Sequence, residues 1–135
     1  MNFIGVTAAL AAFLSVWLGH VAVRRIEFVS PTIWLPAILF ATLGMMMEFA
    51  SLSTAYRPLS AALGILGITL FFDAFELSRQ QKRVKKGHAP ANPNNRRHAR
   101  FLADPNLHAT TRDLLKREPV GHPFPAEEAS TSSTL

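Results

Sequence analysis

The chain contains no cysteine among its 135 residues. Disulfides, iron–sulfur clusters, thiolate nucleophiles and thioether or prenyl attachments are therefore excluded. The sequence also lacks a phosphate-binding glycine loop and any arrangement of serine, histidine and carboxylate that suggests a catalytic triad. We expect no catalytic residue, no cofactor and no metal site, so the chain is at most a subunit of an enzyme complex.

Charge is scarce in the first 78 residues. Of the 14 lysines and arginines, 11 follow Ser78 together with five of the nine acidic residues, which gives that region a formal charge of +6. Because about 20 residues of helix cross a hydrocarbon core of ~30 Å, the apolar runs predict transmembrane helices at about 2–23, 32–52 and 58–78. No Lys or Arg precedes the first run and Arg24 and Arg25 follow it, which favours an uncleaved helix over a signal peptide.

The same charges predict how the spans are oriented. Arg24, Arg25 and the basic tail would lie on one side of the membrane and Arg57 alone on the other, so the positive-inside rule predicts an N-out/C-in topology. We expect an all-α protein of the bacterial cytoplasmic (inner) membrane. Residues 1–87 would form a three-helix transmembrane domain and residues 88–135 a basic cytoplasmic tail, and the positive charge indicates contact with lipid headgroups rather than with nucleic acid.

The tail has its own local signals. We expect the third helix to continue into water and stop at Gly87, followed by a loop rich in proline and asparagine. Asp104 and Pro105 then predict the start of a short amphipathic helix over 105–118, which would lie on lipid or on a partner. Residues 119–135 have the composition of a low-complexity end.

Small residues indicate where the predicted spans pack against other helices, and cations indicate where they contact headgroups or partners. Small side chains recur at helical spacing and let helices approach closely; in the first and third spans we select Gly5, Ala9, Ala12, Ser60, Gly64 and Gly67. The cations at the inner ends would contact headgroups or partner subunits: Arg24, Arg25, Arg79, Lys82, Arg83, Lys85 and Lys86. Glu48 is expected near the outer surface, in contact with water.

A candidate polar site is formed by four ionisable residues near the inner ends of the spans: His20, Glu27, Asp73 and Glu76. Asp73 and Glu76 are three residues apart and share a helix face with Arg79. One interpretation is that Arg79, Arg24 or Arg25 neutralises the carboxylates, which then only mark the membrane boundary. The other is a proton or ion relay, or a quinone or lipid headgroup site, that uses Asp73, Glu76 and His20.

Several motifs together resemble a family of small bacterial integral membrane proteins of unknown function. They are MNFIG at the start, Gly19 with His20, Glu27, Trp34, the Ser-Ala-x-Leu-Gly-x-x-Gly of 60–67, Glu76 with Leu77, and QKRVKKGHAPANP from Gln81. The resemblance covers about residues 1–95 and implies a protein of about a hundred residues with three apolar segments. Asp73 and the tail beyond Arg96 depart from the family pattern, and the tail looks like an addition.

Two functions follow as hypotheses. The first is a small non-catalytic membrane subunit or scaffold, whose partners are membrane lipids and larger subunits of a membrane complex. The second is participation in proton or ion movement, or in a quinone or lipid site at the cytoplasmic leaflet, through Asp73, Glu76 and His20.

Overall fold

The computed structural model describes residues 3–113, and within them the chain forms four helices and no strand. The three long helices are α1 (Ile4–Val29), α2 (Trp34–Ser53) and α3 (Arg57–Lys85), and the short helix α4 (Arg96–Ala103) follows. Each of α1, α2 and α3 is long and apolar enough to cross a membrane. The predicted all-helical fold with three apolar helices is confirmed.

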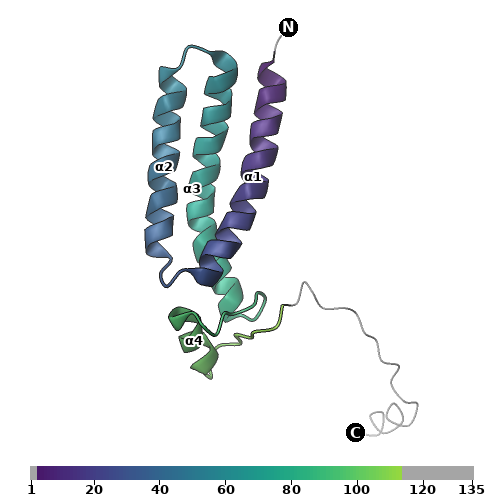
Figure 1. The fold of residues 1–135 in the computed structure, drawn as a ribbon, viewed down its shortest axis with the longest axis vertical. Helices are drawn as coiled ribbons and strands as arrows, with labels where there is room; N and C mark the ends of the chain where they lie inside the picture. Colours follow the sequence, from purple (N-terminus) through teal and green to yellow (C-terminus); the bar gives the residue numbers. More distant parts are fainter. Residues whose placement is uncertain (1–2, 114–135) are drawn as a thin grey trace, which may run out of the picture.

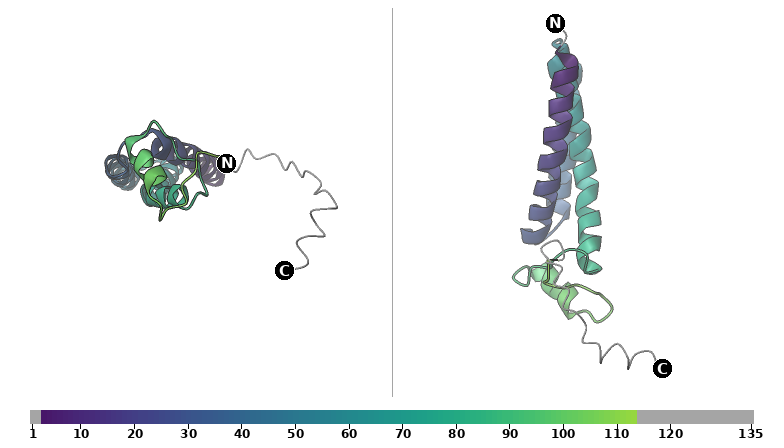
Figure 2. Two further views of the ribbon diagram at one scale, coloured as in Figure 1. Left: turned by 90° about the horizontal axis from the view of Figure 1, so that it is seen from below. Right: turned by 90° about the vertical axis from the view of Figure 1, so that its right-hand side faces the viewer.

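The central helix is α3, which lies between α1 and α2 and packs against both (Figure 1). Figure 2 shows the same three helices along their axes and from the side, with α4 below the end of α3. Large apolar side chains on all three helices point outward: Trp17, Phe49 and Phe72 are 58%, 63% and 68% exposed. Such a surface is suited to lipid or to apolar partners rather than to water.

The contact row of α1 differs from the expected one. Its buried residues are Ser15, Gly19, Val23 and Glu27, which recur every four residues and so lie on one side of the helix. Gly5 meets nothing within 4 Å of an added Cβ, and Ala9 is exposed. These two small residues of α1 therefore lie outside the buried row.

Helices α2 and α3 form a tight hairpin. Ser51 Oγ donates to the Ser60 carbonyl at 2.8 Å and Ser60 Oγ donates to the Ser51 carbonyl at 2.9 Å. A Cβ on Gly44 would lie 2.8 Å from the Gly67 carbonyl oxygen, so the two backbones are in direct contact. The small residues chosen in the third span therefore face α2.

Glu48 was expected near the outer surface, in contact with water, and the structure shows that it also packs against α3. Its side chain is half-buried between α2 and α3, with Oε1 2.5 Å from the position of a Cβ on Gly67. The absence of a side chain at Gly67 gives the Glu48 carboxylate its space.

The ends of α1 and α3 can be compared with the predicted ends. Helix α1 continues through Arg24 and Arg25 to Val29, where a connection was expected. Helix α3 extends past Ser78 to Lys85, and Gly87 follows with φ of 75°, so the expected stop is confirmed. The expected loop after Gly87 contains α4.

The helix expected over 105–118 is not present in its described part, because residues 104–113 form turns and an isolated bridge. Asp104 ends α4 instead of starting a helix, and its Oδ1 accepts from the Asn106 amide at 2.9 Å. The following residues bond to the chain after α3: the Ala91 amide donates to the Thr110 carbonyl at 2.8 Å. Residues 114–118 and the low-complexity end lie outside the described residues.

Candidate functional site

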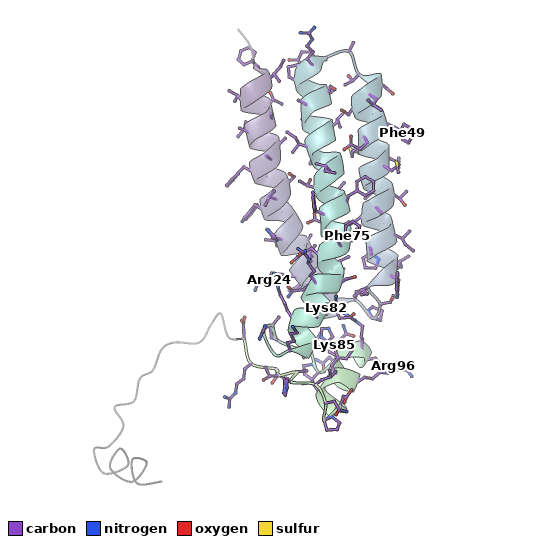
Figure 3. All side chains as sticks on the ribbon, turned by 180° about the vertical axis from the view of Figure 1, so that it is seen from behind. Arg24, Phe49, Phe75, Lys82, Lys85 and Arg96 are labelled. Carbon is purple, nitrogen blue, oxygen red and sulfur yellow. The ribbon has the colours of Figure 1, made fainter. Side chains whose placement is uncertain are left out.

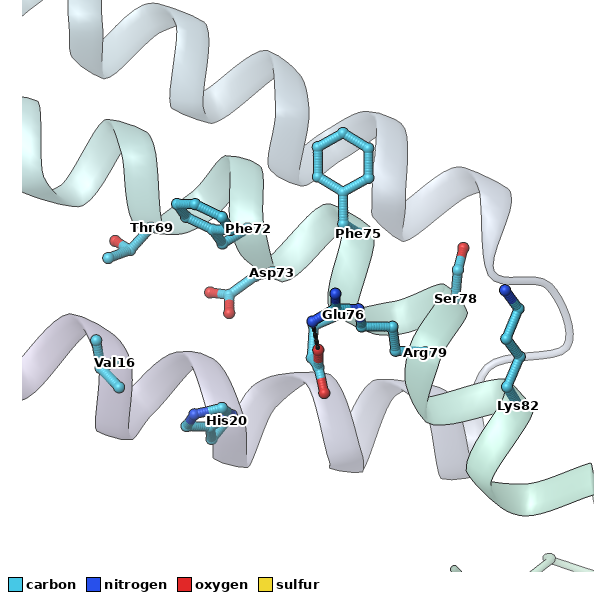
Figure 4. Close-up of a pocket in the computed structure, with 10 residues that line it drawn as sticks. All are labelled: Val16, His20, Thr69, Phe72, Asp73, Phe75, Glu76, Ser78, Arg79 and Lys82. Atoms are coloured by element: carbon cyan, nitrogen blue, oxygen red, sulfur yellow. Dashed lines mark ion pairs between the residues drawn. The ribbon is translucent and has the colours of Figure 1, made fainter. Parts of the chain in front are cut away.

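A cavity of about 600 Å³ opens between α1 and α3 (Figure 4). Three of the four expected polar residues line it, His20 from α1 and Asp73 and Glu76 from α3. The rest of the lining is apolar, hydroxylic or cationic: Val16, Thr69, Phe72, Phe75, Ser78, Arg79 and Lys82. Every one of these lining residues belongs to α1 or α3, so within residues 3–113 these two helices border the cavity.

The Asp73 carboxylate points toward α1 (Figure 4). It lies against Gly19, where an added Cβ would be 2.6 Å from Oδ1 and 2.8 Å from Cγ. Glycine at position 19 therefore makes room for a half-buried carboxylate between two helices. Within residues 3–113 no cation lies within ion-pair distance of Asp73, in contrast to the other carboxylates described below.

Glu76 is neutralised at the mouth of this cavity. It pairs with Arg79 at 3.8 Å and with Arg83 at 3.4 Å, and both arginine side chains are largely exposed. Pairing with Arg79 was one of the two expected interpretations, whereas Arg24 and Arg25 do not pair with it. Exposed pairs of this kind contribute about 0–1 kcal/mol to stability.

Glu27 lies elsewhere, in a second and largely buried cluster. Its side chain is 1% exposed, and its Oε1 lies 3.1 Å from Arg97 Nη1 and 2.9 Å from His98 Nε2. The Asn92 amide donates to His98 Nδ1 at 2.9 Å, so Nδ1 carries no proton. His98 Nε2 therefore carries the ring proton and donates a hydrogen bond to the Glu27 carboxylate, while Arg97 supplies the compensating positive charge.

The same segment caps the end of α1. The last carbonyls of a helix have no partner within the helix. Asn95 Nδ2 donates to the Phe28 and Ser30 carbonyls at 3.1 and 2.9 Å, and Asn92 Nδ2 donates to Phe28 at 3.2 Å. Arg97 Nη2 donates to the Glu27 carbonyl at 2.6 Å. We call Glu27, Asn92, Asn95, Arg97 and His98 the clamp cluster, because it fastens α4 to α1.

These arrangements differ in what they can do chemically. The members of the clamp cluster pair chiefly with one another and with the end of α1, so the cluster has the character of a structural contact, although the buried Arg97 Nε and Nη1 form no hydrogen bond within residues 3–113. The cavity between α1 and α3 holds a carboxylate and an imidazole in a partly open space, where protons or a polar ligand can be exchanged. Among residues 3–113 no three histidine or carboxylate side chains come together in a way that could hold a metal ion.

A family described as a domain of unknown function, DUF4491, matches residues 2–95. The chain belongs to this family. Comparisons with curated proteins and with solved structures found no match. The DUF4491 region contains the three long helices and ends at Asn95, so two of the five clamp residues, Arg97 and His98, lie just beyond it.

Sequence reasoning selected Glu27 but grouped it with His20, Asp73 and Glu76. The residues that contact Glu27 and the end of α1 were not predicted. They are Asn92, Asn95, Arg97 and His98. A signal was present, because a carboxylate at the end of an apolar helix needs a partner when it is buried. The dense run of Asn, Arg and His over 92–98 contained suitable donors, but nothing in the spacing showed that this run folds back onto α1.

Proposed function

We propose that the chain is a small non-catalytic subunit or scaffold of a larger protein complex in the bacterial cytoplasmic membrane. The observation that carries this proposal is the cavity between α1 and α3. Ionisable groups at membrane depth usually face the interior of a helix bundle or water. Here only two helices border the cavity with His20, Asp73 and Glu76, so a partner helix over it would complete the enclosure that the described chain leaves open.

An N-out/C-in topology is part of the proposal. Arg24, Arg25 and the cations from Arg79 to Arg100 lie at the α4 end of the helices, and Arg57 lies at the opposite end. The positive-inside rule assigns the α4 end to the cytoplasm. Since the natural chain has no cysteine, single cysteines introduced at Thr32 and Thr54 can be compared for labelling by a membrane-impermeant thiol reagent; labelling from outside is expected at position 54 alone.

Site-specific photo-crosslinking tests the subunit role. Phe72 lines the cavity and is 68% exposed, whereas Phe49 is 63% exposed on α2 and does not line it. A photoreactive phenylalanine at position 72 is expected to give a protein adduct in cells, and the same residue at position 49 serves as the matched control. Lipid adducts at both positions, with no protein adduct at 72, would contradict the proposal.

Proton or ion movement is the second candidate, and a specific observation favours it. Asp73 and His20 line one cavity, and no cation within residues 3–113 pairs with Asp73. In vesicles containing the protein with any subunits that co-purify, Asp73→Asn is expected to abolish a proton flux followed with a pH-sensitive dye. An unchanged flux in a variant that remains folded would remove this candidate.

A further inference from the structure

A second cavity, of about 780 Å³, lies where the connection between α1 and α2, the end of α3 and α4 meet. Its lining is unusual in charge, because five of its residues are cations and no carboxylate of the described chain lines it. The cations are Lys82, Lys85, Arg96, Arg97 and Arg100. Figure 3 labels three of them, Lys82, Lys85 and Arg96, at the α4 end of the molecule. We call this space the basic cavity.

Only some of these cations are already engaged. Arg97 pairs with Glu27, and the Lys85 ammonium lies 4.8 Å from the centre of the Phe101 ring. Lys82, Arg96 and Arg100 are exposed, and within residues 3–113 none of them forms an ion pair. Three unneutralised charges around one space create a strong local preference for an anion.

An apolar groove of about 410 Å³ adjoins the basic cavity between α2 and α3. The two spaces share Ile33, Trp34 and Ser78 in their linings, so they lie next to each other. The groove continues along the helices between small and aromatic side chains: Ala37, Ile38, Ala41, Phe71, Ala74 and Phe75. From Trp34 to Ala41 it follows α2 for about 10 Å toward the middle of the apolar span.

We propose that this combined space binds one anionic phospholipid. Its phosphate headgroup lies in the basic cavity against Arg96, Arg100 and Lys82, and one acyl chain follows the groove between α2 and α3. Trp34 sits where the cavity and groove join, which is the interfacial position that indoles favour. Basic pockets next to membrane helices bind anionic headgroups, and the groove adds a requirement for a chain that a free phosphate ion lacks. This site goes beyond the subunit role and does not depend on it.

The headgroup is tested with full-length protein in mild detergent by native mass spectrometry. Phosphatidylglycerol and phosphatidylcholine with identical acyl chains are titrated, and preferential retention of phosphatidylglycerol is expected. At roughly five-fold per charge lost, Arg96→Gln with Arg100→Gln should weaken phosphatidylglycerol binding about 25-fold. The matched control is Arg24→Gln with Arg25→Gln, which removes two exposed charges at the same end but outside the basic cavity. Equal weakening by both pairs would overturn a localised site.

The acyl chain is tested separately. Ala41→Phe fills the groove and is expected to reduce phosphatidylglycerol retention at least five-fold, whereas Ala50→Phe, on the exposed face of α2, should leave it unchanged. Inorganic phosphate at millimolar concentration should not displace the lipid. If phosphate displaces the lipid and Ala41→Phe has no effect, the basic cavity is a free-anion site. If a protein co-purifies with the natural chain and is lost in the Arg96→Gln, Arg100→Gln variant, the basic cavity is a protein interface. Either result would overturn the lipid proposal.

Discussion

The buried ion pair of the clamp cluster offers a sharp prediction. Glu27→Gln removes the negative charge that faces Arg97 and keeps nearly the same side-chain shape. The Glu27 side chain is 1% exposed, that of Arg97 is 11% exposed and that of His98 is fully buried. In the variant the Arg97 charge would remain buried against a neutral amide. We therefore expect α4 and the segment around it to undock from α1 much more often.

The size of the effect follows from the cost of an uncompensated buried charge. Removing one partner of a buried pair costs about 3–5 kcal/mol. A glutamine at position 27 retains one oxygen that can accept from His98 or Arg97, so we take the lower limit, about 3 kcal/mol. At ~1.4 kcal/mol per factor of ten, the population of the undocked state should rise by about 150-fold.

Limited proteolysis measures this population. Trypsin can cut after Arg97 only when the clamp cluster is open, and the rate follows the open fraction when closing is faster than cleavage. Cleavage after Arg97 in Glu27→Gln should therefore be about 150-fold faster than in the natural protein. Glu76→Gln is the matched control, since its partners are exposed and its pairs are expected to contribute no more than about 1 kcal/mol. Equal cleavage rates in the natural protein and Glu27→Gln would refute the reasoning.

Two glycine substitutions give further predictions. A Cβ on Gly44 would lie 2.8 Å from the Gly67 carbonyl oxygen, so Gly44→Ala should destabilise the hairpin by about 1–3 kcal/mol, measured as a lower unfolding temperature in detergent. Unchanged unfolding would show that the backbones are not in contact. Gly87→Ala places a side chain at φ of 75° against the His108 carbonyl oxygen, which should cost at least about 1–2 kcal/mol. This destabilisation should be seen as faster hydrogen exchange at the His108 amide. The control Gly5→Ala, which places a side chain in open space, should not change that exchange.

The sequence was sufficient for the long helices because their signal is local. Uninterrupted apolar runs of about 20 residues permit few structures other than a membrane helix or a buried one. The stop of α3 was also predictable, because Gly87 is suited to the left-handed conformation that ends a helix. The contact row of α1 was not predictable in the same way. Both the Gly5 row and the Ser15 row contain small residues, and only the position of α3 decides between them.

The segment after α3 was predicted wrongly for a physical reason. Residues 105–118 have a capping signal and a leucine face, but a short isolated helix is marginal. In the described part, backbone bonds to residues near the end of α3 replace helical ones: the His108 amide donates to the Lys85 carbonyl at 3.0 Å. Conversely, α4 lies where a loop was expected: the Asn95 side chain accepts from the Arg97 amide at 3.0 Å, and His98 is buried against α1. Tertiary contacts decided both outcomes.

Glu27 and Asp73 show how differently one chain treats two carboxylates near the ends of its spans. Glu27 receives a guanidinium and an imidazole from residues about seventy positions further along the chain, so its partners are supplied within the described fold. Asp73 has a glycine opposite it and a cavity beside it, and no such partner among residues 3–113. Substitutions at Glu27 should therefore act through the stability of α4 docking. Substitutions at Asp73 should leave that docking intact and act through whatever contacts the cavity between α1 and α3.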